Sequence, residues 1–339
     1  MYQSINFGVI GVQETDLEKK MQLAKRHGFT HMEAGADEVT ACGVEKVKAL
    51  LQQYGMEITC FNVPFHPVQV SEEEFASRME ALPAQAKAMS QVGCSRSIIW
   101  IIPGSDTLPY EENYALHVRR LSQVARVYGE YGIRLGLEFI GPYTARKNSK
   151  YPFLYTAEKM LELARDCGEN VGLLFDSWHW FTGADNRDVF AHIGDPGAIV
   201  NVHINDAPEG PLEELVDSTR GLPGETGRID IQFVLNGLRQ RAMTAPWWPS
   251  PSALCSAPFP TTRKRPRWSK NIWTWSGTVL FKPLRLSEKR RPKTFYDAEP
   301  LALRISPNCV RRYSMLVSLV FGIAPGALAA AGGRKGNPL

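Results

Sequence analysis

The 339-residue chain lacks several features that would assign it to a class at once. Its six cysteines are scattered and include no Cys-x-x-Cys pair, which argues against a disulfide framework and favours reduced thiols in a cytoplasmic protein. No Gly-x-Gly-x-x-Gly or Walker-type loop follows an apolar run, which disfavours a nucleotide-binding open sheet. The N-terminus shows no secretory signal, and Pro325 and several glycines interrupt the apolar stretch near the C-terminus, so we expect no membrane segment.

Acidic residues become scarce near residue 240. Residues 241–339 carry 17 Lys+Arg and 3 Asp+Glu, whereas residues 1–240 carry 22 and 32. Residues 241–339 also hold 12 of the 23 prolines and 5 of the 8 tryptophans. The net charge of +4 therefore describes neither part, and the break predicts an acidic globular domain over 1–240 followed by a basic, Pro- and Trp-rich, disordered tail over 241–339.

The region 1–240 alternates short β-rich runs with amphipathic stretches. Strands are predicted at 5–11, 31–35, 57–63, 97–102, 134–140, 171–177 and 199–205, and helices at 16–27, 44–54, 72–92, 111–131, 156–166, 188–193 and 229–240. The strands are nearly continuous apolar runs, as expected when both faces of a parallel sheet are covered. Seven such units predict a (β/α)₈ barrel whose eighth unit is lost or replaced by the tail.

Polar residues gather at the carboxyl ends of three consecutive predicted strands. Glu138 ends strand five, Asp176 ends strand six, and His203 lies near the end of strand seven. These ends meet at one mouth of a barrel, where catalytic residues collect. Because buried charges need compensation, two carboxylates and an imidazole predict a site for a divalent cation such as Mn²⁺, Mg²⁺ or Co²⁺. For each residue alone, a helix cap, an ion pair or a hydrogen-bonded core histidine is the simpler interpretation.

Four segments, "GLEF", "LLFDSWHW", "VHINDAP" and "LPGETGRID", carry a resemblance to the xylose-isomerase-like sugar isomerases and epimerases. The family includes ketose 3-epimerases, hydroxypyruvate isomerases and inosose dehydratases, and the resemblance covers about residues 5–240. It implies that Glu138, Asp176 and His203 bind the metal and that Glu138 is also a catalytic base. It further implies that His179 contacts a substrate hydroxyl and that Arg220 binds substrate, although a solvated surface arginine is an equal alternative for Arg220.

The resemblance also implies the chemistry and the partners. A bound cation would polarise a sugar carbonyl, and Glu138 would remove the proton from the adjacent carbon through an enediolate. The expected partner is a sugar or a sugar phosphate, with no nucleic acid or membrane, and a homo-oligomer is allowed. Trp178 and Trp180 could stack on a sugar ring or pack at the rim, and His66 could face the pocket or lie in a loop.

In the family, strand eight ends in a glutamate that is the fourth metal ligand and serves the opposite substrate face. Here no acidic residue lies between Asp230 and Glu288. From Arg241 onward, the third base of each codon can be read together with the first two bases of the next codon. These new codons can encode the string Gly-Tyr-Asp-Gly-Pro-Val-Val-Ala-Glu-Pro. In that string the Asp and the adjacent second Val and Ala are forced by the codons of Met, Thr, Trp and Pro. We therefore predict that the chain is out of frame from about residue 241.

Two consequences and two alternatives follow. Without strand eight, strands one and seven would have open edges, and the chain would bind metal weakly and have little activity.

One alternative is a zinc-dependent abasic-site endonuclease, which needs three metals and more histidines. The other is a non-enzymatic protein that binds nucleic acid through basic segments such as "TTRKRPRWSK".

Overall fold

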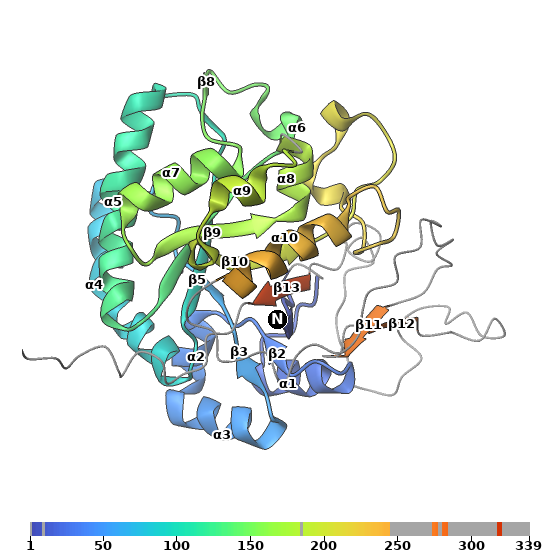
Figure 1. Ribbon diagram of the computed structural model, residues 1–339. Coiled ribbons are helices and arrows are strands. Elements are labelled where there is room, and N and C mark those ends of the chain that lie inside the picture. The colour runs from blue at the N-terminus through green and yellow to red at the C-terminus, as the bar shows by residue number, and fades with distance from the viewer. Residues whose placement is uncertain are drawn as a thin grey trace, which may run out of the picture.

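The computed structural model describes residues 2–8, 11–183, 186–244, 273–276, 280–283 and 317–320 (Figure 1). The strands of the main sheet are β1 (Tyr2–Ile5), β2 (His31–Met32), β3 (Glu57–Ile58), β4 (Phe61–Asn62), β5 (Arg96–Ile101), β7 (Arg134–Phe139), β9 (Val171–Asp176), β10 (Ile199–Ile204) and β13 (Val317–Val320). Two ribbons pair β6 (Gly104–Ser105) with β8 (Tyr151–Pro152), and β11 (Trp273–Ser276) with β12 (Leu280–Pro283). The helices are α1 (Leu17–Arg26), α2 (Ala36–Cys42), α3 (Val44–Tyr54), α4 (Glu72–Gln91), α5 (Tyr110–Glu130), α6 (Tyr143–Arg146), α7 (Ala157–Cys167), α8 (Ser177–Gly183), α9 (Val189–Ile193) and α10 (Ile231–Thr244), with short 3-10 turns η1 (Pro196–Ala198), η2 (Leu212–Glu214) and η3 (Asp217–Thr219).

The main sheet has the strand order β3-β2-β1-β13-β10-β9-β7-β5-β4. Its two end strands are consecutive pieces of one segment, because only Thr59 and Cys60 separate β3 from β4. The first piece pairs with β2 and the second with β5, so the sheet curls back on itself. All pairings among these strands are parallel except those of β13, which confirms the predicted barrel built from βα units.

Burial of both strand faces explains why the sheet forms from these runs. All six residues of β9 and all six of β10 are buried. The covering helices present one apolar face each, as in α7, where Met160, Leu161 and Ala164 are buried at helical spacing. Thr156 caps the same helix by accepting a hydrogen bond from the backbone N–H of Lys159 at 3.4 Å. Within the described part of the chain, no helix is both long and apolar enough to cross a membrane.

The structure differs from the sequence prediction in several places. The first strand is Tyr2–Ile5 rather than 5–11, because Asn6 and Gly8 begin a turn in which the Gly11 N–H donates to the Gly8 carbonyl at 3.1 Å. Helices α2, α6 and α8 were not predicted. The edges of strands one and seven are not open, because β13 pairs with both β1 and β10. Figure 1 shows β13 in red beside the N-terminal end of the chain.

Most of the predicted tail lies outside the described residues. Helix α10 continues to Thr244, four residues past the predicted boundary at 240, and three short strands, β11, β12 and β13, are described further along. The predicted disorder and the predicted change of reading frame therefore fall largely on residues about which the structure says nothing, and both stay predictions.

Candidate metal centre

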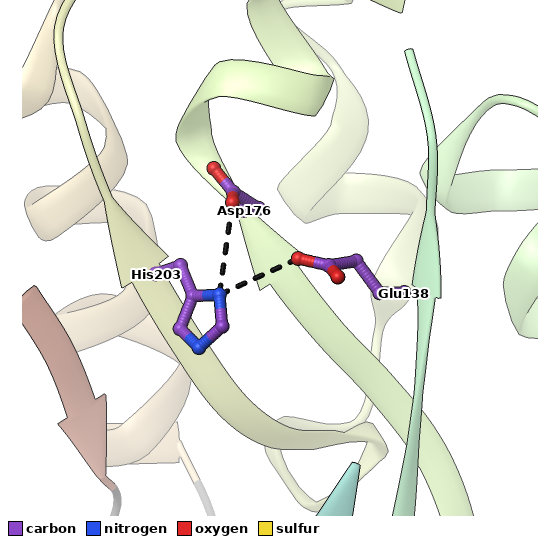
Figure 2. Close-up of side chains that lie close together, drawn as sticks. All are labelled: Glu138, Asp176 and His203. Atoms are coloured by element: carbon purple, nitrogen blue, oxygen red, sulfur yellow. Dashed lines mark ion pairs between the residues drawn. The ribbon is translucent and has the colours of Figure 1, made fainter. Parts of the chain in front are cut away.

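Glu138, Asp176 and His203 lie together at the carboxyl ends of three neighbouring strands (Figure 2). Each offers one ligand atom, and these atoms all lie within 4.8 Å of one another. The His203 Nδ1 atom is 3.4 Å from Glu138 Oε1 and 3.7 Å from Asp176 Oδ2. Among the described residues this is the one group of three or more His, Cys, Asp or Glu side chains with such geometry.

Strand register places these side chains on the interior face of the barrel. His203 on β10 is the direct partner of Asp176 on β9. Glu138 on β7 pairs with Leu174, which lies two residues before Asp176 and therefore shares its face. The convergence thus follows from the parallel pairing, and burial keeps bulk water away from the Asp176 and His203 side chains.

His179 extends this cluster from the first turn of α8. Its Nε2 atom lies 3.9 Å from Glu138 Oε1, and its Nδ1 atom accepts a hydrogen bond from the Gly141 backbone N–H at 3.2 Å. The Arg220 Nη2 group lies 3.0 Å from Nε2, so two donors point at this ring, and a neutral imidazole can accept from only one of them. Only glycine fits at position 141, because a Cβ atom there would lie 2.0 Å from the His179 carbonyl oxygen.

Arg220 lies in the site rather than in bulk solvent, so the surface alternative for this residue is wrong. Its side chain is 14% exposed. The Nη1 atom donates to Asp176 Oδ2 at 2.6 Å, and the Nη2 atom lies 3.0 Å from His179 Nε2 and 2.6 Å from Asp217 Oδ1. The guanidinium therefore supplies positive charge beside the same carboxylate that faces His203.

These contacts shift the pKa values of the buried groups. Burial would raise the pKa of Asp176, but the positive charge of Arg220 and the His203 imidazole hold it well below its ordinary value. Burial, followed by the charge of Arg220, lowers the pKa of His179. Burial opposes protonation of His203, yet the Asp176 and Glu138 carboxylates raise its pKa to about 10. Two adjacent carboxylates thus hold a proton on His203 when no cation is bound.

This proton predicts a pH dependence of the metal-free protein. The folded-state pKa of His203 exceeds its unfolded value, so its stabilisation is complete below pH 6.5 and is lost as the pH rises toward 10. In a chelating buffer, the free energy of unfolding should fall by about 1 to 2 kcal/mol between pH 7 and 8.5. Urea denaturation at both pH values measures this change. The His203→Asn variant should show a flatter profile, and an equal slope in both proteins would contradict the assignment.

Asp206, the last residue of the motif "VHIND" and two residues past the end of β10, anchors the loop that carries Arg220. Its carboxylate is fully buried, and it accepts hydrogen bonds from the backbone N–H groups of Ala207 (2.8 Å), Thr226 (2.9 Å), Gly227 (2.7 Å) and Ile229 (3.0 Å). Its backbone also forms a two-way bridge with Gly221, the residue after Arg220. Asp206 therefore positions the arginine without facing the cluster itself.

Replacing Asp206 with asparagine should lower the free energy of unfolding by about 2 to 4 kcal/mol, because the amide –NH₂ cannot accept from two of the four N–H groups. Chemical denaturation checks this value. The matched control is Asp230→Asn: Asp230 is half-exposed and accepts from the Phe233 N–H at the start of α10, where asparagine serves equally well. Equal losses from the two variants would show that the buried carboxylate has no special role.

Sequence reasoning missed Trp100 and Asn205 of this site, whereas it had named His66 as a residue of the pocket or of a loop. Trp100 on β5 is the register partner of Glu138, and 46% of it is exposed at the barrel mouth. His66 lies beside it, with Nε2 3.1 Å from the Trp100 carbonyl oxygen and the two rings edge to face at 5.5 Å. Asn205 donates from Nδ2 to Asp176 Oδ1 at 3.0 Å. Only strand register could have found Trp100, whereas Asn205 stands inside a quoted motif.

The two tryptophans of "DSWHW" do not offer a stacking surface. Trp178 is fully buried and Trp180 is 3% exposed. The Trp180 ring stacks on Phe233 of α10 with centroids 5.5 Å apart, and its Nε1 donates to the Asn186 carbonyl at 3.0 Å. Both side chains pack α8 against the barrel, which is the rim-packing alternative.

Comparison with known proteins gives consistent matches. The sequence profile of the xylose isomerase-like TIM barrel matches residues 21–255. An inosose isomerase from Bacillus velezensis is 30% identical over 121 residues, which are 35% of this chain and 40% of that protein. An inosose isomerase from Bacillus subtilis is 29% identical over the same length and the same shares. The chain therefore aligns with about 40% of the length of the curated relatives it matches.

Solved structures extend the match over most of the barrel. A xylose isomerase domain protein from Alicyclobacillus acidocaldarius is 28% identical, with a TM-score of 0.65 over 71% of this chain and 85% of that chain. The IolI protein, whose structure contains a bound zinc atom, has a TM-score of 0.59 at 19% identity over 71% of this chain and 85% of its own. At 19% identity, the match to IolI shows a shared fold and no more.

Proposed function

Because the chain belongs to the xylose isomerase-like TIM barrel family, we propose that it is built as a divalent-metal-dependent isomerase or epimerase of sugars or sugar phosphates. The observation that carries the proposal is the meeting of the Glu138, Asp176 and His203 ligand atoms within 4.8 Å. The inosose isomerase relatives support the reaction class. The scattered cysteines support a cytoplasmic location.

The side chains present fit a divalent cation. Two carboxylates and one imidazole are the donor set that Mn²⁺, Mg²⁺ or Co²⁺ accepts, and the zinc atom in IolI is a property of that protein. His203 would bind through Nδ1, the atom that faces both carboxylates. Its pKa of about 10 means that a cation must displace the proton, so binding should release a proton and strengthen as the pH rises.

The chain's own residues then have distinct roles. When bound, the cation would polarise a substrate carbonyl. Glu138 is the partly exposed ligand, at 13% side-chain exposure, and so it is the carboxylate that can reach a proton on the adjacent carbon. His179 would contact a substrate hydroxyl through Nε2, and Arg220 presents a fixed positive charge to substrate oxygens. The exposed ring of Trp100 borders the same space.

Sequence limits what this chain can do as it stands. No acidic residue is available between Asp230 and Glu288 to supply a fourth ligand or to serve the opposite substrate face. We therefore propose that the metal is bound weakly and that turnover is low. A three-metal endonuclease is less well supported, because the described residues hold one metal-ligand cluster and the domain over 1–240 is acidic.

Hydrogen exchange at carbon tests the proposal directly. The protein is incubated in D₂O with an inosose, a ketose or hydroxypyruvate and with Mn²⁺, Mg²⁺ or Co²⁺, and NMR follows deuterium entering the carbon next to the carbonyl. The expected result is metal-dependent exchange with one of these substrates, abolished by chelator and by Glu138→Gln. Metal binding without any exchange, in this chain and in one with the alternative reading frame after residue 240, would overturn the proposed reaction.

A further inference from the structure

The barrel has a gap at the position of an eighth strand, between β1 and β10, and β13 bridges it. Tyr2 to Ile5 pair with Val320 to Val317, and Val202 to Ile204 pair with Leu319 to Val317. Both pairings are antiparallel, whereas β1–β2 and β10–β9 are parallel. A βα repeat delivers its strands in parallel, so β13 is not the product of an eighth repeat.

The register of β13 places one of its residues at the level of the metal cluster. Ser318 stands directly opposite His203 on one side and Ser4 on the other. Directly opposed residues of an antiparallel pair share a face of the sheet. His203 and Ser4 are buried on the interior face, where Ser4 is 2.6 Å from Thr59 in a hydroxyl-to-hydroxyl hydrogen bond. Position 318 therefore belongs to the interior face, in the row that continues through His203 to Asp176.

Polar groups of β10 beside this gap lack partners. Asn201 is fully buried, two residues before His203 and on the same face, and neither its Oδ1 nor its Nδ2 finds a hydrogen-bond partner in the part of the chain that the structure describes. The buried His203 Nε2 atom likewise has no hydrogen-bond partner among the described residues. Buried amides are normally paired, so these groups indicate an eighth strand with polar interior residues. The bridging segment completes the backbone ladder but leaves these side chains unmatched.

We propose that Val317–Val320 acts as a stand-in for the eighth barrel strand, and that position 318 is the point from which that strand reaches the metal cluster. The first part depends only on backbone pairing. The second part rests on the proposed function, because it assumes that Glu138, Asp176 and His203 hold a cation. A carboxylate at position 318 would complete the charge and the ligand set of the site.

The strand assignment is tested in the full chain with Leu319→Pro. Leu319 is opposite both Gln3 and Val202, and proline removes its N–H from the ladder. Deuterium exchange followed by mass spectrometry should show amides of Tyr2–Ile5 and Ile199–Ile204 exchanging about tenfold faster or more. The matched control, Leu328→Pro, makes the same change in the same apolar stretch outside the described residues and should leave both peptides protected. Unchanged protection in Leu319→Pro, or equal loss in both variants, would overturn the assignment.

The register is tested with Ser318→Asp in the same full chain. Its Mn²⁺ dissociation constant, measured by electron paramagnetic resonance, should be about tenfold or more below that of the unaltered chain, because a carboxylate joins the cluster. Ser314→Asp adds the same charge four residues earlier and should leave the affinity roughly unchanged. Equal affinity of the two variants, with measurable binding, would overturn the position of residue 318. Absence of Mn²⁺ binding in every variant, with the exchange result as expected, would overturn the proposed function and leave the stand-in strand supported.

Discussion

Translation in the alternative reading frame from codon 241 onward should raise metal-dependent turnover by about 10²- to 10⁴-fold over the chain as it stands, the usual contribution of a positioned acid or base. The regrouped codons permit Asp-Gly-Pro-Val-Val-Ala-Glu-Pro, in which a turn precedes an apolar run that ends in a glutamate. Such a run, following α10 directly, would enter the gap between β1 and β10 in parallel and displace β13. It would bring a third carboxylate, and with it a fourth ligand, to the cluster of Glu138, Asp176 and His203.

The control for this experiment is the frame-restored protein with the strand-eight glutamate replaced by glutamine. It should keep the stability gained from a parallel eighth strand and lose most of the gain in turnover and metal affinity. Equal turnover of the frame-restored protein and of the present chain would refute the change of frame as the cause of low activity. Resequencing the DNA around codon 241 tests the change of frame itself, and a clean read in the present frame would oppose it.

The barrel could be predicted because its signal is local and repeated. Strands β5, β7, β9 and β10 lie within one residue of their predicted bounds, since each is a buried apolar run followed by an amphipathic helix. The first strand could not be placed in this way, because the run "INFGVIG" continues past the turn at Gly8. The bridging strand β13 begins 73 residues after the end of α10, and no local pattern connects it with β1 or β10.

The residues of the candidate site also differ in whether a local sequence pattern predicts them. Residues at the carboxyl ends of strands could be predicted, because parallel strands bring those ends together, and the structure places Glu138, Asp176 and His203 in one cluster. Trp100 could not, because an apolar residue within an apolar strand gives no sign that it faces the mouth. Asp206 was visible in the sequence as one more acid at a strand end, but three of its four backbone hydrogen bonds come from a loop that begins twenty residues later.

Replacing Asp176 with asparagine should weaken Mn²⁺ binding by about 100-fold or more. This loss is at least as large as that from removing a side chain that only orients a metal ligand. The change keeps the shape of the side chain and an Oδ1 acceptor for the Trp178 N–H and for Asn205 Nδ2. It removes the negative charge at Oδ2, the atom that faces His203 Nδ1 and Arg220 Nη1. Isothermal titration, with circular dichroism to verify the fold, measures the effect in both the present and the frame-restored chains.

Asp217→Asn is the matched control, because Asp217 contacts the same arginine at 2.6 Å but is 57% exposed and lies outside the metal cluster. If the Asp176 carboxylate acts as a ligand, only its own variant should lose affinity, since Arg220 retains one acidic partner in either case. If Asp176 serves only to hold Arg220 in place, the two variants should bind Mn²⁺ alike. The second result would remove Asp176 from the ligand set. The three strands would then not form a shared metal site.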